Sequence, residues 1–589
     1  MRLVRPANAD VEAPVVKHFP WLRTRERRAV NPNKHVMKSS IAYRIAAALA
    51  GLAGVVALAA YPQNKDGKPA PAPLFDQLGS YERDVSTKDP LAQRYFNQGM
   101  MFLWGFNHHE AVRSFKAAAE LDPQLAIAWW GVAFAHGPNI NALMEEGARP
   151  PALAALDQAR ALARHGSDWE RAWIDALGAR YSEKPDTDQA ELNVAYAKAM
   201  QDVARRFPGD LDAAVLHADA VMNTMAWDYW LADRTTPKPE TREIIAALEA
   251  VLAKDPHHPG ANHALIHLVE AGPEPAQGLA SAERLRFYAP DAGHLVHMPS
   301  HIFMRTGMYQ EAALANERAA KADRAYITSC QAQGFYPGMY YPHNEHFLWW
   351  AYTFQGRKSD SVEKAGKIVA LASSPICGTP VAEKQRFTHL SLLTAVRFGD
   401  AEAILAATEP PEAEPLDRVM WHWARATAYS ARGDAAAATR EANASREIAG
   451  GEAVAAMDNV YLPAIKIAGI AARLAEGRAA LARGETEAGL GALREAVALE
   501  DAMPYMEPAF WFYPTRHTLG AALLALGRAD EATAVFREDL KVWPENGWAL
   551  HGLALALEKQ GDAPGAAAAR KRFEQAWQQA DVAPTLAMY

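Results

Sequence analysis

The sequence predicts an all-α solenoid, and three observations support this fold class. At 589 residues the chain is several times longer than a single-core domain, so it should divide or extend as a repeat array. Half of its residues are apolar, which supplies a continuous core and excludes wholesale disorder. Helical periodicity begins near Leu91 and continues, broken by short turns, through the rest of the chain.

A recurring pattern of small and aromatic residues identifies the repeat. The first copy comprises Tyr95, Gly99, Phe102, Ala111, Phe115, Ala118 and Pro123. A later copy comprises Gly520, Ala532, Phe536 and Pro544, followed by Trp548 and Gly552, and its turn recurs as Gly307/Ala312 and Gly433/Ala438. The pattern resembles the 34-residue signature of tetratricopeptide (TPR) repeats. The resemblance implies a TPR-type α-solenoid, a right-handed superhelix of antiparallel helix pairs.

The N-terminal segment resembles an export signal. Lys38 and Arg44 precede an uncharged run over 45–60 that contains an A-x-A cleavage pattern ending at Ala59. We expect cleavage after Ala59, a periplasmic or secreted product, and Met37 rather than Met1 as the true start. The alternative is a retained anchor, but the run is shorter than the roughly 20 residues that a spanning helix needs. We therefore expect no stable membrane insertion after cleavage.

The rest of the chain divides by composition. Residues 60–90 are expected to form an extended leader rich in Pro, Lys and Asp. An N-terminal TPR-like array over 91–408 contains most of the informative histidines, and a C-terminal TPR array covers 416–589. The Pro-rich segment Glu409 to Pro415 between them is predicted to act as a hinge.

Composition excludes several classes of function. Residues 1–59 carry ten basic and three acidic residues, so their removal leaves a net charge near −15 and argues against nucleic acid or anionic membrane as a partner. Only Cys330 and Cys377 are present, which excludes a disulfide framework and a cysteine-rich metal site but leaves one bridge open. No P-loop, Rossmann fingerprint, nucleophile elbow, haem-attachment or zincin motif is found, which disfavours a standard hydrolase, kinase or cytochrome.

Seven of the 20 histidines cluster in one stretch of the N-terminal array. They are His263 and His267; His294, His297 and His301; and His343 and His346. Spacings of three, four and seven residues place each group on one face of its own helix. Pro256 and Pro290 mark consecutive repeats 34 residues apart, so the second group should lie over the first. By the TPR resemblance all seven face a concave groove, on three neighbouring helices about 10 Å apart.

This pattern predicts a transition-metal site, because imidazole is the commonest side-chain ligand for such ions. Seven histidines exceed one tetrahedral site, so one or two ions are expected. A set dominated by histidine favours copper or zinc over magnesium or a carboxylate-bridged di-iron centre. Copper is favoured over zinc, and the nearby Met298, Met304, Met308 and Met339 would also suit it, although methionine in a solenoid is more often a core residue. If the site is catalytic, an open position would activate water or dioxygen, with Glu270 or Tyr341 handling protons.

Two other interpretations stay open. The chain could be a non-catalytic scaffold that binds a peptide or partner protein in its groove, with the histidines serving recognition, or the histidines could be purely structural. His422 falls at a normally buried repeat position and is expected to be structural. The loops over 105–108 and 137–141 are interpreted as capping and turn segments.

A second candidate group lies in the C-terminal array. Glu507, Tyr513, Arg516 and His517 belong to an aromatic segment that precedes the Gly520 repeat, and His517 falls at a groove position. If the superhelix closes on itself, this segment could reach the histidine cluster and add ligand-binding groups. The alternative is ordinary aromatic packing at the start of a helix.

Short blocks carry a closer resemblance. They are the segments over 105–108, 258–263, 293–301 and 341–344. They resemble a group of exported bacterial TPR proteins and, more distantly, the animal tetratricopeptide repeat protein 38. The resemblance implies the fold and the motif boundaries and leaves the chemistry open.

Overall fold

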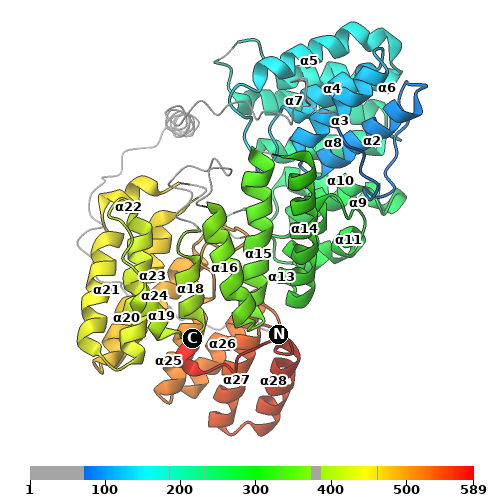
Figure 1. Cartoon of the computed structure of the whole chain (residues 1–589). Coiled ribbons are helices and arrows are strands. Elements are labelled where there is room, and N and C mark those ends of the chain that lie inside the picture. The colour runs from blue at the N-terminus through cyan, green and yellow to red at the C-terminus, as the bar shows by residue number, and fades with distance from the viewer. Residues whose placement is uncertain (1–71, 185, 232–233, 333, 373–386, 460–461) are drawn as a thin grey trace, which may run out of the picture. The chain divides into compact units, whose positions relative to one another are not determined.

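The computed structural model describes residues 72–184, 186–231, 234–332, 334–372, 387–459 and 462–589 (Figure 1). Within these ranges the secondary structure is helical apart from three isolated bridges. None of the helices described there is both long and apolar enough to cross a membrane. The expected export signal, the Met37 start, the cleavage point at Ala59 and Cys377 lie outside these ranges.

The helices follow one another as antiparallel neighbours. In the first part they are α2 (Pro90–Trp104), α3 (His108–Leu121), α4 (Ala126–Ala135), α5 (Arg149–Leu162), α6 (Asp168–Leu177), α7 (Gln189–Arg206), α8 (Leu211–Thr224), α9 (Pro239–Lys254), α10 (Pro259–Val269), α11 (Leu279–Leu285), α12 (Gly293–His297), α13 (Pro299–Arg305), α14 (Tyr309–Cys330), α15 (Tyr341–Phe354) and α16 (Lys358–Ala372). In the second part they are α18 (Leu390–Arg397), α19 (Ala401–Ala406), α20 (Pro415–Ala431), α21 (Ala435–Ala449), α22 (Glu452–Met457), α23 (Ala464–Ala482), α24 (Thr486–Asp501), α25 (Thr515–Ala525), α26 (Ala529–Val542), α27 (Gly547–Gln560) and α28 (Ala563–Ala576). Figure 1 shows α20, α21, α23 and α24 packed side by side.

The predicted repeat packing is present at both ends of the array. Phe115 of α3 lies between Gly99 of α2 and Gly131 of α4, where an added Cβ would come within 2.6 Å of its ring. Phe536 of α26 lies in the same way between Gly520 and Gly552, with a Cβ separation of 2.5 Å or less. Only glycine lets the paired helices close on the aromatic ring. The TPR-type α-solenoid is therefore confirmed by its own packing.

The helical array begins at α2. Residues 72–89 are non-helical, and α2 begins at Pro90 with Asp89 capping its first N–H groups. The Glu409–Pro415 segment connects α19 to α20. Its role as a hinge stays a prediction.

The C-terminal helices pack back onto the N-terminal array. The indole of Trp350 on α15 donates to the Phe512 carbonyl at 3.0 Å, and that of Trp548 on α27 donates to the Thr353 carbonyl at 2.8 Å. The Tyr309 hydroxyl at the start of α14 donates to the Pro544 carbonyl at 2.8 Å. These contacts bring the segment around Glu507 to the histidine-bearing helices.

Candidate metal centre

Four helices bring six of the seven predicted ligand histidines together. α10 carries His263 and His267, α12 carries His294 and His297, α13 carries His301, and α15 carries His343. Their ligand atoms form two sets, each with all members within 4.8 Å of one another. We call His263, His267 and His294 the first triad, and His297, His301 and His343 the second triad. The triads adjoin, since the ring centroids of His294 and His297 are 5.6 Å apart.

The histidines are buried inside the array. The three side chains of the first triad are at most 2% exposed, and so are those of His297 and His301, while His343 is half-buried. The expectation that they line an open concave groove is therefore wrong. The turn after α2 and the segment around Glu507 cover them, which no spacing within the histidine stretch could indicate.

Local sequence explains how the middle group is presented. The sequence predicts one continuous helix through His294, His297 and His301, but the structure has two short helices, α12 and α13, that meet at Met298 and Pro299. Proline lacks the N–H that a continuous helix requires. The rings of His297 and His301 still lie 4.7 Å apart, so the break does not separate them.

In the first triad each α10 histidine is oriented by a partner on its Nδ1 atom. His263 Nδ1 lies 2.6 Å from the Trp104 carbonyl oxygen, and His267 Nδ1 lies 2.7 Å from Glu270 Oε1. The backbone carbonyl and the carboxylate each accept a hydrogen bond from Nδ1–H, so the proton is on Nδ1 and the free lone pair is on Nε2. Histidines that bind metal are held in this way by their other nitrogen.

The remaining nitrogens of the first triad are buried without a hydrogen-bond partner among the described residues. They are Nε2 of His263, Nε2 of His267 and both ring nitrogens of His294. A buried polar atom left unpaired costs about 1–3 kcal/mol, and most such atoms in proteins are paired. Burial lowers the pKa of each of these three histidines, so their imidazoles are neutral. Neutral, convergent and unpaired nitrogens are the donor set of a metal site.

The second triad has a different internal arrangement. His297 Nδ1 lies 2.7 Å from Asn316 Oδ1, and the Asn316 amide nitrogen donates to the Ala312 carbonyl, which fixes that oxygen as an acceptor. The Nε2 atoms of His297 and His301 then face each other at 2.8 Å. A shared proton satisfies this pair, and so would a cation, because bonds of about 2.0–2.1 Å from both nitrogens would meet at about 90°.

Glu270 links the two triads. It follows α10, its side chain is fully buried, and its second oxygen pairs with His301 Nδ1 while the first binds His267. Glu507 reaches the same His301 nitrogen at 3.0 Å from the segment before α25. The closure of the chain that could bring Glu507 to the histidines is thus present in the structure.

Charges at this junction oppose the effect of burial. Burial disfavours the charged forms of both partners, but the His301 charge outweighs it and lowers the pKa of Glu270. The Glu270 charge likewise raises the pKa of His301. Burial raises the pKa of Glu507, with His301 opposing. Without a bound cation, His301 therefore holds a proton between two carboxylates.

Two predicted residues of the same stretch lie elsewhere. His346 stacks on Trp349 with ring centroids 5.4 Å apart and meets the edge of Phe387 at 5.3 Å, so α15 turns it away from His343. The ring of Tyr341 lies 5.3 Å from the Lys367 ammonium. The tyrosine against the cluster is Tyr340, whose ring centroid is 4.5 Å from that of His294.

The other C-terminal candidates form a separate network. His517 Nε2 lies 3.0 Å from both Asp539 Oδ2 and the Asn546 amide nitrogen. The Tyr513 ring stacks at 6.3 Å on His517, and Arg516 pairs with Asp501 at the surface. Of the four residues, only Glu507 reaches the histidine cluster.

The methionines and His422 have structural roles. Met298, Met304 and Met308 pack in the main apolar core, and Met339 packs against the aromatic cluster of Tyr326, Tyr336 and Tyr340. His422 pairs with Glu441 at 2.7 Å, as its structural interpretation predicts. The candidate metal ligands are therefore imidazole nitrogens, and the carboxylates contact the histidine rings from the side away from the site.

Phe106 is a residue of the candidate site that the sequence does not reveal. Its loop caps α3 through Asn107, as predicted, but its ring also lies 4.4 Å from His263 and 5.5 Å from His294. Its φ of 55° is an unusual left-handed conformation for a bulky residue. The sequence does not reveal Asn316, which lies behind His297, either. The contacts of Phe106 and of Asn316 with the histidines both depend on tertiary packing.

Comparison with known proteins finds only remote likenesses among solved structures. No family model matches the chain, and no curated protein matches it. Among solved structures, the human IFIT1 dimer is 11% identical over 83% of this chain and 91% of that chain, with a TM-score of 0.29. The APC/C hetero-tetramer Cut9-Hcn1 is 12% identical over 84% and 80%, with a TM-score of 0.35, and yeast Tom70 is 11% identical over 84% and 93%, with a TM-score of 0.25. At these TM-scores the likenesses carry no argument, so the histidine cluster is interpreted from its own geometry.

Proposed function

We propose that the chain is an exported TPR-type scaffold that binds one or two transition-metal ions in its interior. The observation that carries the proposal is the first triad, whose convergent ring nitrogens are buried and unpaired among the described residues. Three imidazoles with a fourth position open match the ligand number of catalytic zinc sites. An all-imidazole set suits copper as well as zinc.

The second triad is the proposed site of a second ion. Its ligand atoms converge as those of the first triad do, but binding there must displace the proton between His297 and His301. The first triad should therefore fill first. Glu270 would orient one ligand in each site, so the two ions would be coupled through it.

Copper remains the favoured ion, although the methionines give it no support. The chemistry that a metal would supply is activation of a bound water or dioxygen at the open position. Both oxygens of Glu270 face histidines, so its proposed role is to hold those ligands and their protons in place. Tyr340 is the tyrosine placed to contact a species bound at His294.

The alternative of peptide recognition by the histidines loses support from their burial. A TPR-type scaffold can still bind a partner on its outer surfaces, and the helical framework is consistent with that use. A peptide side chain cannot reach five imidazoles that are at most 2% exposed without opening the array. The proposal therefore assigns them to a small inorganic ligand.

The test is elemental analysis of tag-free protein, loaded with copper or zinc and then desalted. We expect up to two ions per chain, loss of one in His263→Ala/His267→Ala, and loss of the other in His297→Ala/His301→Ala. His422→Ala is the matched control, because it removes a paired histidine outside the cluster. Wild-type protein that retains no stoichiometric metal would refute the proposal.

A further inference from the structure

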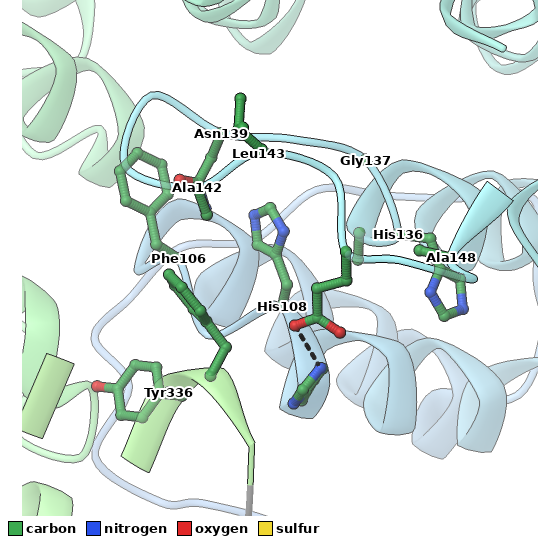
Figure 2. Close-up of a pocket in the computed structure, with 13 residues that line it drawn as sticks. Phe106, His108, His136, Gly137, Asn139, Ala142, Leu143, Ala148 and Tyr336 are labelled. Carbon is green, nitrogen blue, oxygen red and sulfur yellow. Dashed lines mark ion pairs between the residues drawn. The ribbon is translucent and has the colours of Figure 1, made fainter. Parts of the chain in front are cut away.

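A small pocket lies on the outer side of Phe106. It is lined by residues of the α2–α3 turn, of the segment from Ala135 to Ala148, and by Phe335 and Tyr336. Figure 2 shows Phe106, His108 and His136 around it, below the loop that carries Asn139, Ala142 and Leu143. Its cavity volume is about 40 Å³. A cavity needs about 10–15 Å³ to hold one water, so this pocket admits a few waters or a partly hydrated ion and excludes a peptide.

Phe106 separates this pocket from the first triad. Its half-buried ring lines the pocket and lies 6.3 Å from the ring of His108. The same ring contacts His263 and is stacked on His267 and His294 at 6.2 and 5.5 Å. One aromatic side chain therefore stands between a surface pocket and three buried nitrogens without partners.

The pocket wall carries one carboxylate and three imidazole side chains, those of Glu145, His108, His109 and His136. Glu145 is exposed at the wall and accepts from His109 Nε2 at 3.3 Å, a contact that lowers the Glu145 pKa and keeps it charged. Burial lowers the pKa of His108 to about 3 and that of His136 to about 4, so both present neutral imidazoles. A carboxylate and two neutral imidazoles are suitable donors for copper or zinc.

These groups do not form a closed site. Within the described residues, the groups of three or more histidines and carboxylates whose ligand atoms all lie within 4.8 Å of one another are the two triads and the Glu270–His301–Glu507 set. The pocket residues are more widely spread. Such donors suit transient capture, whereas the triads suit retention.

We propose that this pocket is the loading route of the first triad: His108, His136 and Glu145 capture a transition-metal ion, and rotation of Phe106 passes it to His263, His267 and His294. The inference rests on the proposed metal-binding function and adds a defined path to it. Phe106 is the only covering side chain that contacts all three triad rings and also lines the pocket, among the residues that the structure places.

The experiment measures the rate of Zn²⁺ uptake by metal-free protein, followed with a chromogenic zinc indicator. Phe106→Ala should load about tenfold faster than wild type, which corresponds to a barrier lower by about 1.4 kcal/mol. Phe106→Trp should load more slowly, a change that misfolding would not produce together with full final loading. His108→Ala/His136→Ala should slow uptake at low Zn²⁺ with no change in final stoichiometry.

Trp227→Ala is the comparator. Trp227 is also half-buried, has a positive φ and lies edge-on to His267 at 5.2 Å, but it approaches from outside the pocket. Its truncation should not accelerate uptake. Unchanged rates in the Phe106 and His108/His136 variants, or acceleration by Trp227→Ala alone, would overturn the route while leaving the metal site intact. Wild-type protein that takes up no Zn²⁺ would overturn both proposals.

Discussion

The first triad and the His517 network are two regions where the same repeat position holds a fully buried histidine, with opposite results. His263 and His517 fall at equivalent positions of their repeats, and both are at most 2% exposed. His517 has partners on both nitrogens: Asp539 and Asn546 at Nε2, and Arg397 at Nδ1. His263 has one partner, the Trp104 carbonyl, and its Nε2 is left unpaired. Hydrogen-bond satisfaction, rather than burial or repeat phase, distinguishes a structural histidine from a candidate ligand.

The largest expected effect separates the two regions without any metal. His517→Leu removes one of the hydrogen-bond donors of the buried Asp539 carboxylate, which keeps only the Asn546 amide, and should lower the free energy of unfolding by about 3 kcal/mol. His294→Leu removes two unpaired nitrogens at similar volume and should change the stability of metal-free protein by less than about 1 kcal/mol. Urea unfolding of metal-free variants measures both. Comparable losses of unfolding free energy in the two variants would contradict the distinction between a structural histidine and a candidate ligand.

Metal addition should stabilise the first region alone. At a free-ion concentration of 100 times Kd, binding to the native state should raise the free energy of unfolding by about 2.7 kcal/mol. His294→Leu should abolish most of this gain, and His517→Leu should retain it on a lower baseline. Thermal unfolding with and without copper or zinc gives the comparison. Equal gains in both variants would place the ion elsewhere.

The groups that orient the ligands should have smaller effects that differ between the triads. Glu270→Gln should lower the metal affinity of both triads by about 10- to 100-fold, because Glu270 contacts a ligand histidine in each triad. Asn316→Leu should lower only the metal affinity of the second triad, by a similar factor, because His297 is the one ligand histidine that Asn316 contacts. Competition titrations with a chelator of known affinity resolve the two. A uniform effect of Asn316→Leu would show that the triads form one site.

The smallest effect is a pH dependence in the C-terminal region. Burial raises the pKa of Glu500 from 4.5 to about 7, although Thr515 donates to its carboxylate. The raised value means that its contribution to stability is present below pH 4.5 and is lost as the pH rises to about 7. The slope should not exceed about 1.4 kcal/mol per pH unit, the limit for a single titrating group. Urea unfolding at pH 5, 6 and 7 measures how steeply the free energy of unfolding falls with pH, and Glu500→Gln should make this dependence shallower. An unchanged slope in the variant would mean that another group causes the pH dependence.

The sequence by itself determined the fold class and the membership of most of the cluster. The Gly99–Phe115 and Gly520–Phe536 spacings indicate paired helices in which a phenylalanine ring packs against a glycine, and the structure contains both contacts. The 34-residue offset brought α10 next to α12 and α13, because adjacent repeats stack with the same helix face inward. Local periodicity is sufficient for such predictions, since each repeat contacts its neighbours.

Tertiary structure alone decided which histidines are buried together and which of their ring nitrogens have hydrogen-bond partners. Periodicity could not show that Phe106 and Glu507, from segments far away along the chain, cover the triads and turn a predicted groove into a buried cluster. Nor could it show that His346 turns toward Trp349, or that Asp539 satisfies His517. A residue's type and phase set the face on which it lies, but its hydrogen-bond partners come from segments distant in sequence, and those partners determine whether a nitrogen remains free to bind metal.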